Sequence, residues 1–177
     1  GGDADARLLE AHILVGEARW ADALAIYRTL PQLPSARLGE AECLQALGQT
    51  AEAASTLAAS VQAHPENGVA RLRLANLSVE LRDPARARAE LAAVRPATAR
   101  DEEWKAYVGA RLLLIEDRAA EALTVFEDLL RAPERMPDSL VAAAALGNAE
   151  ARIAIRGYEE AEVPLKEFIG RFAESAH

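Results

Sequence analysis

The stretch GQTAEAASTLAASVQAHP, residues 48–65, decides the fold. Six of its eighteen residues are alanine, and they stand between a glycine and a proline that both favour helix ends. Alanine has the highest helix propensity, and its small side chain lets two helix backbones approach closely. The stretch therefore predicts one helix of a closely packed helical protein.

Apolar residues recur with helical spacing along the rest of the chain, and no stretch alternates long enough to indicate a strand. Asp83 before Pro84, Asp101 before two glutamates, and Asp138 after a proline are signals for helix starts. Pro164 predicts a bend in the last helix. We predict ten helices, over residues 4–17, 20–30, 35–47, 51–63, 68–81, 84–94, 101–116, 119–131, 138–155 and 159–173.

Small residues repeat through these helices in pairs. In the second helix of each predicted pair, an alanine is followed four residues later by a larger group. The alanines are Ala23, Ala53, Ala87, Ala122 and Ala161, and the larger groups are Tyr27, Leu57, Leu91, Phe126 and Leu165. The first helices carry their own small residues, which are Ala11, Ala41, Ala75, Ala110 and Ala149. Where the two helices of a pair cross, we expect these small residues to meet.

This pattern resembles the tetratricopeptide repeat, a helix–turn–helix unit of about 34 residues. The resemblance is carried by Trp20-x-x-Ala23-x-x-x-Tyr27, by Gly48-x-Thr50-x-x-Ala53-x-x-x-Leu57 with Pro65, and by Gly157-Tyr158-x-x-Ala161-x-x-x-Leu165. It implies an all-α, right-handed superhelical solenoid of about five repeats. We expect a single array over residues 1–177, with repeats near 4–33, 34–67, 68–100, 101–137 and 138–175, as a fragment of a longer chain.

Composition and charge exclude several classes of partner. The net charge is −8, which disfavours binding to nucleic acid or to anionic lipid and favours a basic or apolar partner. No apolar run is long enough to span a membrane. Of the 20 basic residues only Lys105 and Lys166 are lysines, which suggests a bacterial source. The final segment is similar to the repeat ends of bacterial envelope proteins of this family, which favours the periplasm or cell envelope over the cytoplasm.

No motif for catalysis, a cofactor or a metal is present in the sequence. Cys43 is the only cysteine and lies among apolar neighbours, so we expect a buried, inert thiol. His64 precedes a proline at a helix end and is expected to cap that helix. His12 and His177 lie in other parts of the chain, and we therefore predict no enzyme activity, no cofactor and no metal site.

The resemblance implies a concave groove, lined by the first helix of each repeat, that binds a peptide or protein. The predicted groove residues are Leu8, His12, Leu38, Glu42, Leu72, Arg73, Asn76, Trp104, Tyr107, Arg111, Leu146 and Glu150, with Asp5, Gln45, Val69 and Glu80 beside them. Relatives that bind chaperone tails hold the peptide carboxylate with lysine, asparagine and arginine. Arg73 and Asn76 match part of that set, but the lysines are missing, so we disfavour this ligand.

Trp104, Tyr107 and Arg111 follow the spacing i, i+3 and i+7, so they share one helix face. Their residue types are enriched in binding hot spots. Two interpretations stay open for Trp104, since a shift of two residues in the register would pack it between helices instead of in the groove.

We thus predict a non-catalytic scaffold for protein–protein interaction. One alternative is self-association as an assembly module of a bacterial envelope complex, because Phe168, Ile169 and Phe172 form an apolar end face that suits a homodimer. Another alternative is an accessory domain cut from a multidomain enzyme.

Overall fold

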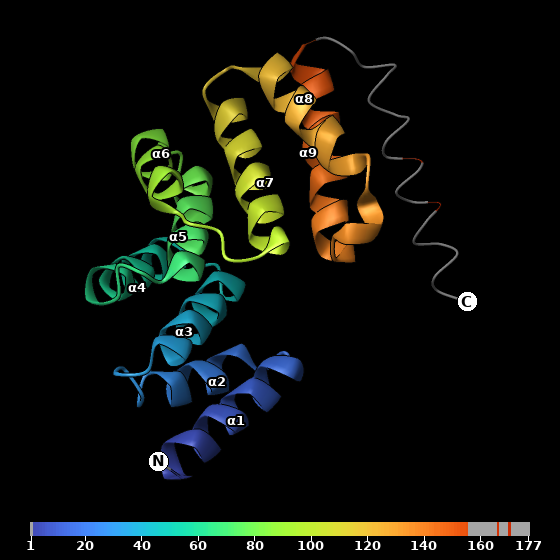
Figure 1. The fold of residues 1–177 in the computed structure, drawn as a ribbon. Helices are drawn as coiled ribbons and strands as arrows, with labels where there is room; N and C mark the ends of the chain where they lie inside the picture. Colours follow the sequence, from blue (N-terminus) through green and yellow to red (C-terminus); the bar gives the residue numbers. More distant parts are fainter. Residues whose placement is uncertain (1, 156–165, 167–169, 171–177) are drawn as a thin grey trace. The chain divides into compact units, whose positions relative to one another are not determined.

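The computed structural model describes residues 2–155 together with Lys166 and Gly170. The described part contains nine α-helices, one short 3₁₀ helix and no strand (Figure 1). The helices are α1 Gly2–Gly16, α2 Trp20–Tyr27, α3 Pro34–Ala46, α4 Thr50–Ala63, α5 Gly68–Glu80, α6 Pro84–Ala93, α7 Ala99–Ile115, α8 Ala119–Leu130 and α9 Asp138–Ala154, with η1 over Pro133–Arg135. The all-α fold and its helix pairs are confirmed. The predicted helix 159–173, with Ala161, Pro164, Leu165, Phe168, Ile169 and Phe172, lies outside the described residues.

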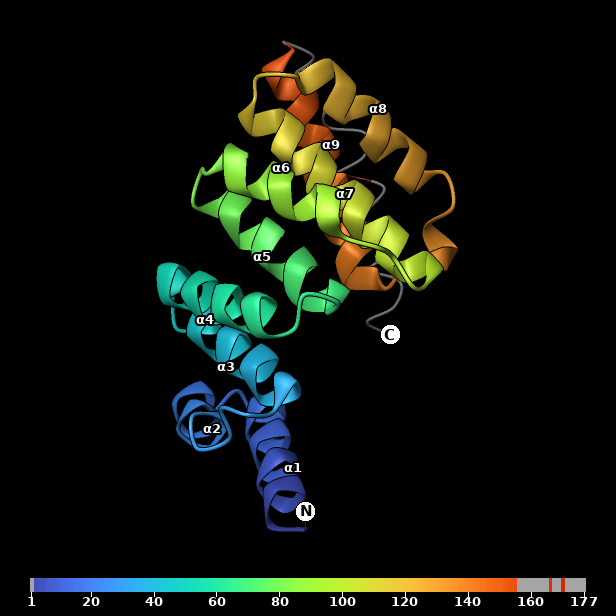
Figure 2. The ribbon, with the colours of Figure 1, turned by 60° about the vertical axis from the view of Figure 1, so that its left-hand side comes forward.

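Two compact units make up the chain, Gly1–Ala93 and Val94–His177. In the first unit α1 packs on α2, α3 on α4, and α5 on α6, and successive pairs join through α2 with α3 and α4 with α5 (Figure 2). In the second unit α8 packs against both α7 and α9. The single array over residues 1–177 and its right-handed superhelix stay predictions.

The predicted small residues that the structure describes lie in the core. The nine described alanines of the two sets are each at most 3% exposed. These nine positions, which the repeat pattern marked, are therefore part of the buried core, and the bounds of the five repeats stay a prediction.

The large residues of the second helices pack on glycines that the sequence did not single out. Gly39 on α3 lies against the ring of Tyr27 on α2, and a Cβ at position 39 would stand 2.6 Å from Cε2 of that ring. Gly147 on α9 has the same relation to Phe126 on α8, with a Cβ 2.6 Å from Cε1. Both rings are buried. At both contacts between successive repeats, an aromatic ring thus fills the space that a side chain at the glycine would occupy.

The turns inside the helix pairs share one backbone conformation. Ala18, Gly48, Arg82 and Asp117 each have positive φ, between 54° and 76°. In each turn the next residue donates its N–H to a carbonyl five residues back, as Arg19 does to Leu14 at 2.9 Å. This is the Schellman ending of a helix, in which glycine is the usual residue. Only one of the four positions is glycine, so sequence alone marked only the turn at Gly48.

One of the predicted helix starts needs correction. Asp83 caps α6 as predicted, because its Oδ1 accepts the N–H of Arg86 at 3.0 Å. The prediction that Asp101 begins a helix is wrong: Thr98 is the cap of α7, and Asp101 is the third residue of a capping box. Asp138 is the first helical residue of α9, as predicted, and Pro137 holds the N-cap position.

Candidate protein-binding surface

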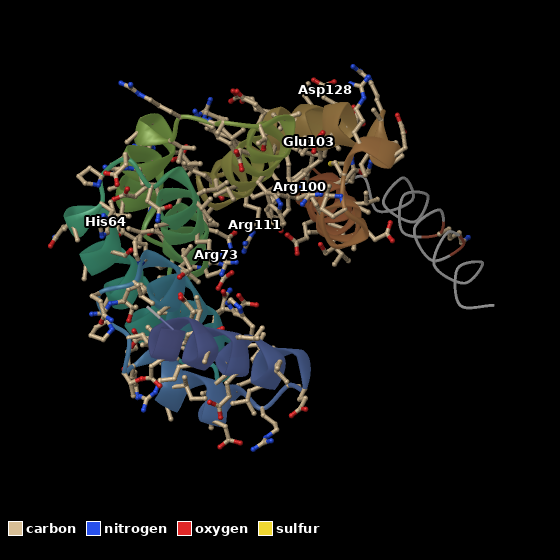
Figure 3. All side chains as sticks on the ribbon, turned by 60° about the horizontal axis from the view of Figure 1, so that its bottom comes forward. His64, Arg73, Arg100, Glu103, Arg111 and Asp128 are labelled. Atoms are coloured by element: carbon tan, nitrogen blue, oxygen red, sulfur yellow. The ribbon has the colours of Figure 1, made fainter. Side chains whose placement is uncertain are left out.

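Polar side chains of α3 and α5 form a hydrogen-bonded surface in the first unit. Arg73 Nη1 donates to Glu42 Oε2 at 3.3 Å, and both side chains are nearly half exposed. Glu80 accepts from Gln45 Nε2 at 3.2 Å and from Asn76 Nδ2 at 3.1 Å. We call these five residues the α3–α5 surface; Figure 3 labels Arg73 on it. Side chains from the first helices of two neighbouring repeats therefore meet here.

Apolar groups accompany the polar ones on the first helices. Leu8 on α1 and Leu38 on α3 pack against the core but keep part of their surface exposed. Leu72 is also partly exposed, and Val69 is 47% exposed. His12 is exposed, with its ring centroid 6.0 Å from that of Tyr27. None of the twelve predicted groove residues is buried, so each can contact a partner.

In the second unit the aromatic residues of α7 share a face, as predicted. The rings of Trp104 and Tyr107 meet edge to face at 5.7 Å between centroids. Arg111 lies over the Tyr107 ring with its Cζ 5.9 Å from the centroid, close enough for a cation–π contact. Figure 3 labels Arg111.

These aromatic side chains also pack inside the unit. Trp104 and Tyr107 contact the cluster of Met136, Leu140 and Val141, while each remains partly exposed. The structure thus shows the contacts that the packing interpretation of Trp104 expects. Its place in the groove stays a prediction. The remaining predicted residues of this unit lie on α9, where Leu146 is 52% exposed and Glu150 is also exposed.

Cys43 and His64, two of the residues considered for catalysis, both have structural surroundings. Cys43 is fully buried, and burial, with a smaller effect of Glu42, raises the pKa of its thiol to about 11. The thiol is therefore protonated at neutral pH and shielded from reagents. His64 ends α4, where its N–H donates to the carbonyl of Ser60 at 2.9 Å, as expected for a cap (Figure 3).

No group of three or more His, Cys, Asp or Glu in the described part of the chain could hold a metal ion. No described helix is both long and apolar enough to cross a membrane.

A buried acid at the α2–α3 contact was missed by the sequence reasoning. Glu40 is 5% exposed and accepts from Arg37 Nη1 at 2.9 Å and from Arg28 Nε at 3.4 Å. Arg28 also bonds Glu52 on α4 at 2.6 Å. A buried carboxylate needs such paired partners. The sequence signal that could have revealed this ion pair is an acid on the core face of a first helix, together with a basic residue directly after the aromatic residue of the preceding helix.

A known protein family is similar to the middle of the chain. The family model described as Tetratricopeptide repeat matches residues 44–110, which contain α4, α5 and α6 complete. These residues are similar to tetratricopeptide repeats. No curated protein matches the sequence at a significant level.

Solved structures extend the likeness to the whole chain. A tetratricopeptide repeat protein from Parabacteroides merdae superposes with a TM-score of 0.77 at 15% identity, over 94% of this chain and 64% of its own. The double mutant MamA RS-1 ArsTM gives 0.72 at 12% identity, over 100% and 99% of the two chains. TPR-like repeats from Podosopora anserina give 0.70 at 17% identity, over 97% and 95%. The chain thus has the tetratricopeptide repeat fold, and it spans less than two thirds of the Parabacteroides merdae structure.

Proposed function

We propose that this chain is a non-catalytic scaffold that binds a protein or peptide along the exposed faces of its first helices. Tetratricopeptide repeats are in general protein–protein interaction modules, which is the coarse basis of the proposal. The observation that supports it most directly is the α3–α5 surface. There, hydrogen-bonded polar groups of two helices stay exposed beside partly exposed leucines.

The α3–α5 surface is suited to binding because its side chains are already held in place. Arg73 and Glu42 fix one another, and Glu80 is fixed by both Gln45 and Asn76. A partner that docks on such groups loses less of its binding energy to ordering side chains. The backbone below is equally fixed, because buried alanines pack the helices closely.

The chemistry of the surface favours a partner with basic and apolar residues. Acidic groups outnumber basic ones on it, and the net charge of the chain is −8. Nucleic acid does not fit this charge. A peptide carboxylate is equally disfavoured, because Arg73 is paired with Glu42.

The test is a selection of displayed peptides against the wild-type chain, followed by binding measurements on two double variants. Glu42→Ala with Arg73→Ala removes the ion pair of the α3–α5 surface. Arg118→Ala with Glu121→Ala is the matched control, because it removes an exposed ion pair of the same net charge from a turn of the second unit. We expect selected peptides rich in lysine, arginine and apolar residues, bound about tenfold more weakly by the first variant than by the control. Equal affinities for the two variants would exclude this surface.

The proposal extends to the source of the protein and to its role within a longer chain. The Arg-rich, Lys-poor composition supports a bacterial source, with an envelope setting as the preferred location. Because the chain spans less than two thirds of the Parabacteroides merdae structure, we also keep the role of an accessory domain within a longer protein as a proposal.

A further inference from the structure

One face of α1 exposes apolar side chains that a water-facing helix does not need. Leu9 is 61% exposed and Ile13 is 55% exposed, the two highest values among the large apolar residues described. Ala6 and Glu10 are also exposed. Positions 6, 9, 10 and 13 form a single stripe along a helix. We call these four residues the α1 outer face.

The first and last positions of the same stripe are buried in α3, α5 and α9. Counted from the alanine at each crossing, the position of Ala6 corresponds to Ala36, Ala70 and Ala144, all 0% exposed. The position of Ile13 corresponds to Cys43, Leu77 and Ala151, at most 2% exposed. In α3, α5 and α9 this stripe packs against the second helix of the preceding repeat, which is α2, α4 and α8 respectively. No described helix packs against this stripe on α1. The α1 outer face therefore has the form of a contact surface between repeats, without a packing partner among the described residues.

The size of residue 9 limits what can pack there. Gly39 and Gly147, at the corresponding positions of α3 and α9, make room for the aromatic rings of Tyr27 and Phe126. Where α5 carries Arg73 at this position, with its side chain exposed and paired with Glu42, the preceding helix carries Leu57 instead of an aromatic residue. Leu9 likewise leaves no room for a ring. The helix that fits the α1 outer face therefore presents a leucine at this position.

The charge of Glu10 adds a second requirement. Glu10 corresponds to Glu40 of α3, whose carboxylate is paired with Arg37 of its own helix at 2.9 Å and with Arg28, the residue directly after Tyr27, at 3.4 Å. An acid that becomes buried needs such a partner. The fitting helix therefore carries a lysine or arginine directly after its leucine.

The chain contains one sequence with this combination. The residues that follow the large group of each second-helix motif are Arg28, Ala58, Ala92, Glu127 and Lys166. Only Leu165 followed by Lys166 combines leucine with a basic residue, and Ala161 supplies the small residue four positions earlier. Lys166 is exposed. We propose that the α1 outer face binds residues 158–172 of a second copy of this chain, with Lys166 of that copy paired to Glu10.

This contact is head-to-tail, because it joins two different surfaces. Each copy then keeps one unused α1 outer face and one unused 158–172 segment, so association continues beyond the dimer unless the chain closes into a ring. We choose a second copy as the partner because residues 158–172 combine the leucine, the small residue and the basic residue that the α1 outer face requires.

The test is light scattering on a sizing column over a concentration series, with single and double charge reversals. For the wild type we expect the molar mass to rise with concentration past that of a dimer. Glu10→Lys and Lys166→Glu should each move this rise to about tenfold higher concentration, because each puts like charges together. The double variant restores opposite charges and should return the rise to within about threefold of the wild-type concentration.

Two controls separate this contact from other effects. Glu134→Lys makes the same change of charge at an exposed position of η1 and should leave the mass curve unchanged. Ile13→Asp should abolish the rise, while Leu146→Asp, a matched change at the exposed Leu146 of α9, should not. Circular dichroism confirms that each variant is folded. A monomer at every wild-type concentration, a rise indifferent to Glu10→Lys, or a double variant no better than the single ones would each overturn the proposal.

Discussion

At the scale of single residues, Tyr27 and Phe126 differ by one hydroxyl group in equivalent places. Each ring is buried against a glycine of the next repeat. The Tyr27 hydroxyl has no hydrogen-bond partner among the described residues. Burial, with smaller effects of Cys43 and Glu42, raises its pKa to about 12. The hydroxyl therefore loses its bonds to water on folding without replacing them, and Phe126 shows that the ring alone fills the site.

We therefore expect Tyr27→Phe to stabilise the protein. The free energy of unfolding should rise by about 1 kcal/mol, because an unsatisfied buried hydroxyl is removed. It is measured by urea denaturation at pH 7. A loss of stability instead would mean that the hydroxyl is bonded in solution.

The same variant predicts a change at high pH. A folded-state pKa above the unfolded value of about 10 means that wild-type stability is fully present below pH 10 and is lost as the pH rises toward 12. Tyr27→Phe should lose less stability over this interval. Cys43, whose pKa is also raised, titrates in both proteins and cancels in the comparison.

At the scale of elements, local patterns were predictable and contacts between distant segments were not. The buried alanines and the shared face of Trp104, Tyr107 and Arg111 follow from spacing within one helix. The Schellman turns at Ala18, Arg82 and Asp117 carry no glycine to mark them.

The aromatic–glycine contacts had no common spacing in the sequence. The segment containing η1 separates Phe126 from Gly147 more widely than Tyr27 is separated from Gly39. The packing of Trp104 on Met136 is equally remote in sequence, so two interpretations of Trp104 were left open.

The start of α7 shows how an acid near a helix start can be assigned to the wrong position. Asp101 accepts from the N–H groups of Thr98 and Ala97 at 3.0 and 3.1 Å, and its own N–H donates to Thr98 Oγ1 at 3.2 Å. Hydrogen bonding with Thr98, aided by these backbone groups, holds the pKa of Asp101 below its usual range. We expect Thr98→Ala to lower the free energy of unfolding by about 1 kcal/mol, as measured by urea denaturation.

Asp101→Asn tests the electrostatic part of this cap. Because the folded-state pKa is lowered, the stabilisation is fully present above the unfolded pKa of about 4 and is lost as the pH falls through the folded value. The deficit of the variant in thermal melts should therefore be largest at neutral pH and shrink in acid. Glu102→Gln, in the same helix turn but outside the capping box, is the control. A deficit of equal size for both substitutions would assign the effect to charge at the helix end and not to the box.

At the scale of the whole molecule, stability is built from contacts between neighbouring helices. The extensive helix contacts of the first unit join helices within its three pairs or between successive pairs, and the second unit is built on α8 against α7 and α9. In such repeat arrays the stability is close to a sum over repeats and their interfaces. A change at one interface should therefore act mainly within its own unit.

Two glycines of the second unit test this directly. Gly147→Ala places a methyl group against the buried Phe126 ring, whereas Gly109→Ala, inside α7, meets no described atom within 4 Å. Overpacking costs about 1–3 kcal/mol, which exceeds the gain of about 1 kcal/mol in helix propensity that both variants receive. Gly147→Ala should thus destabilise the second unit and Gly109→Ala should stabilise it. Hydrogen exchange followed by mass spectrometry should show faster exchange in α7–α9 for Gly147→Ala, with the amides of Gly1–Ala93 unchanged. Faster exchange throughout the chain would instead show that the two units unfold as one.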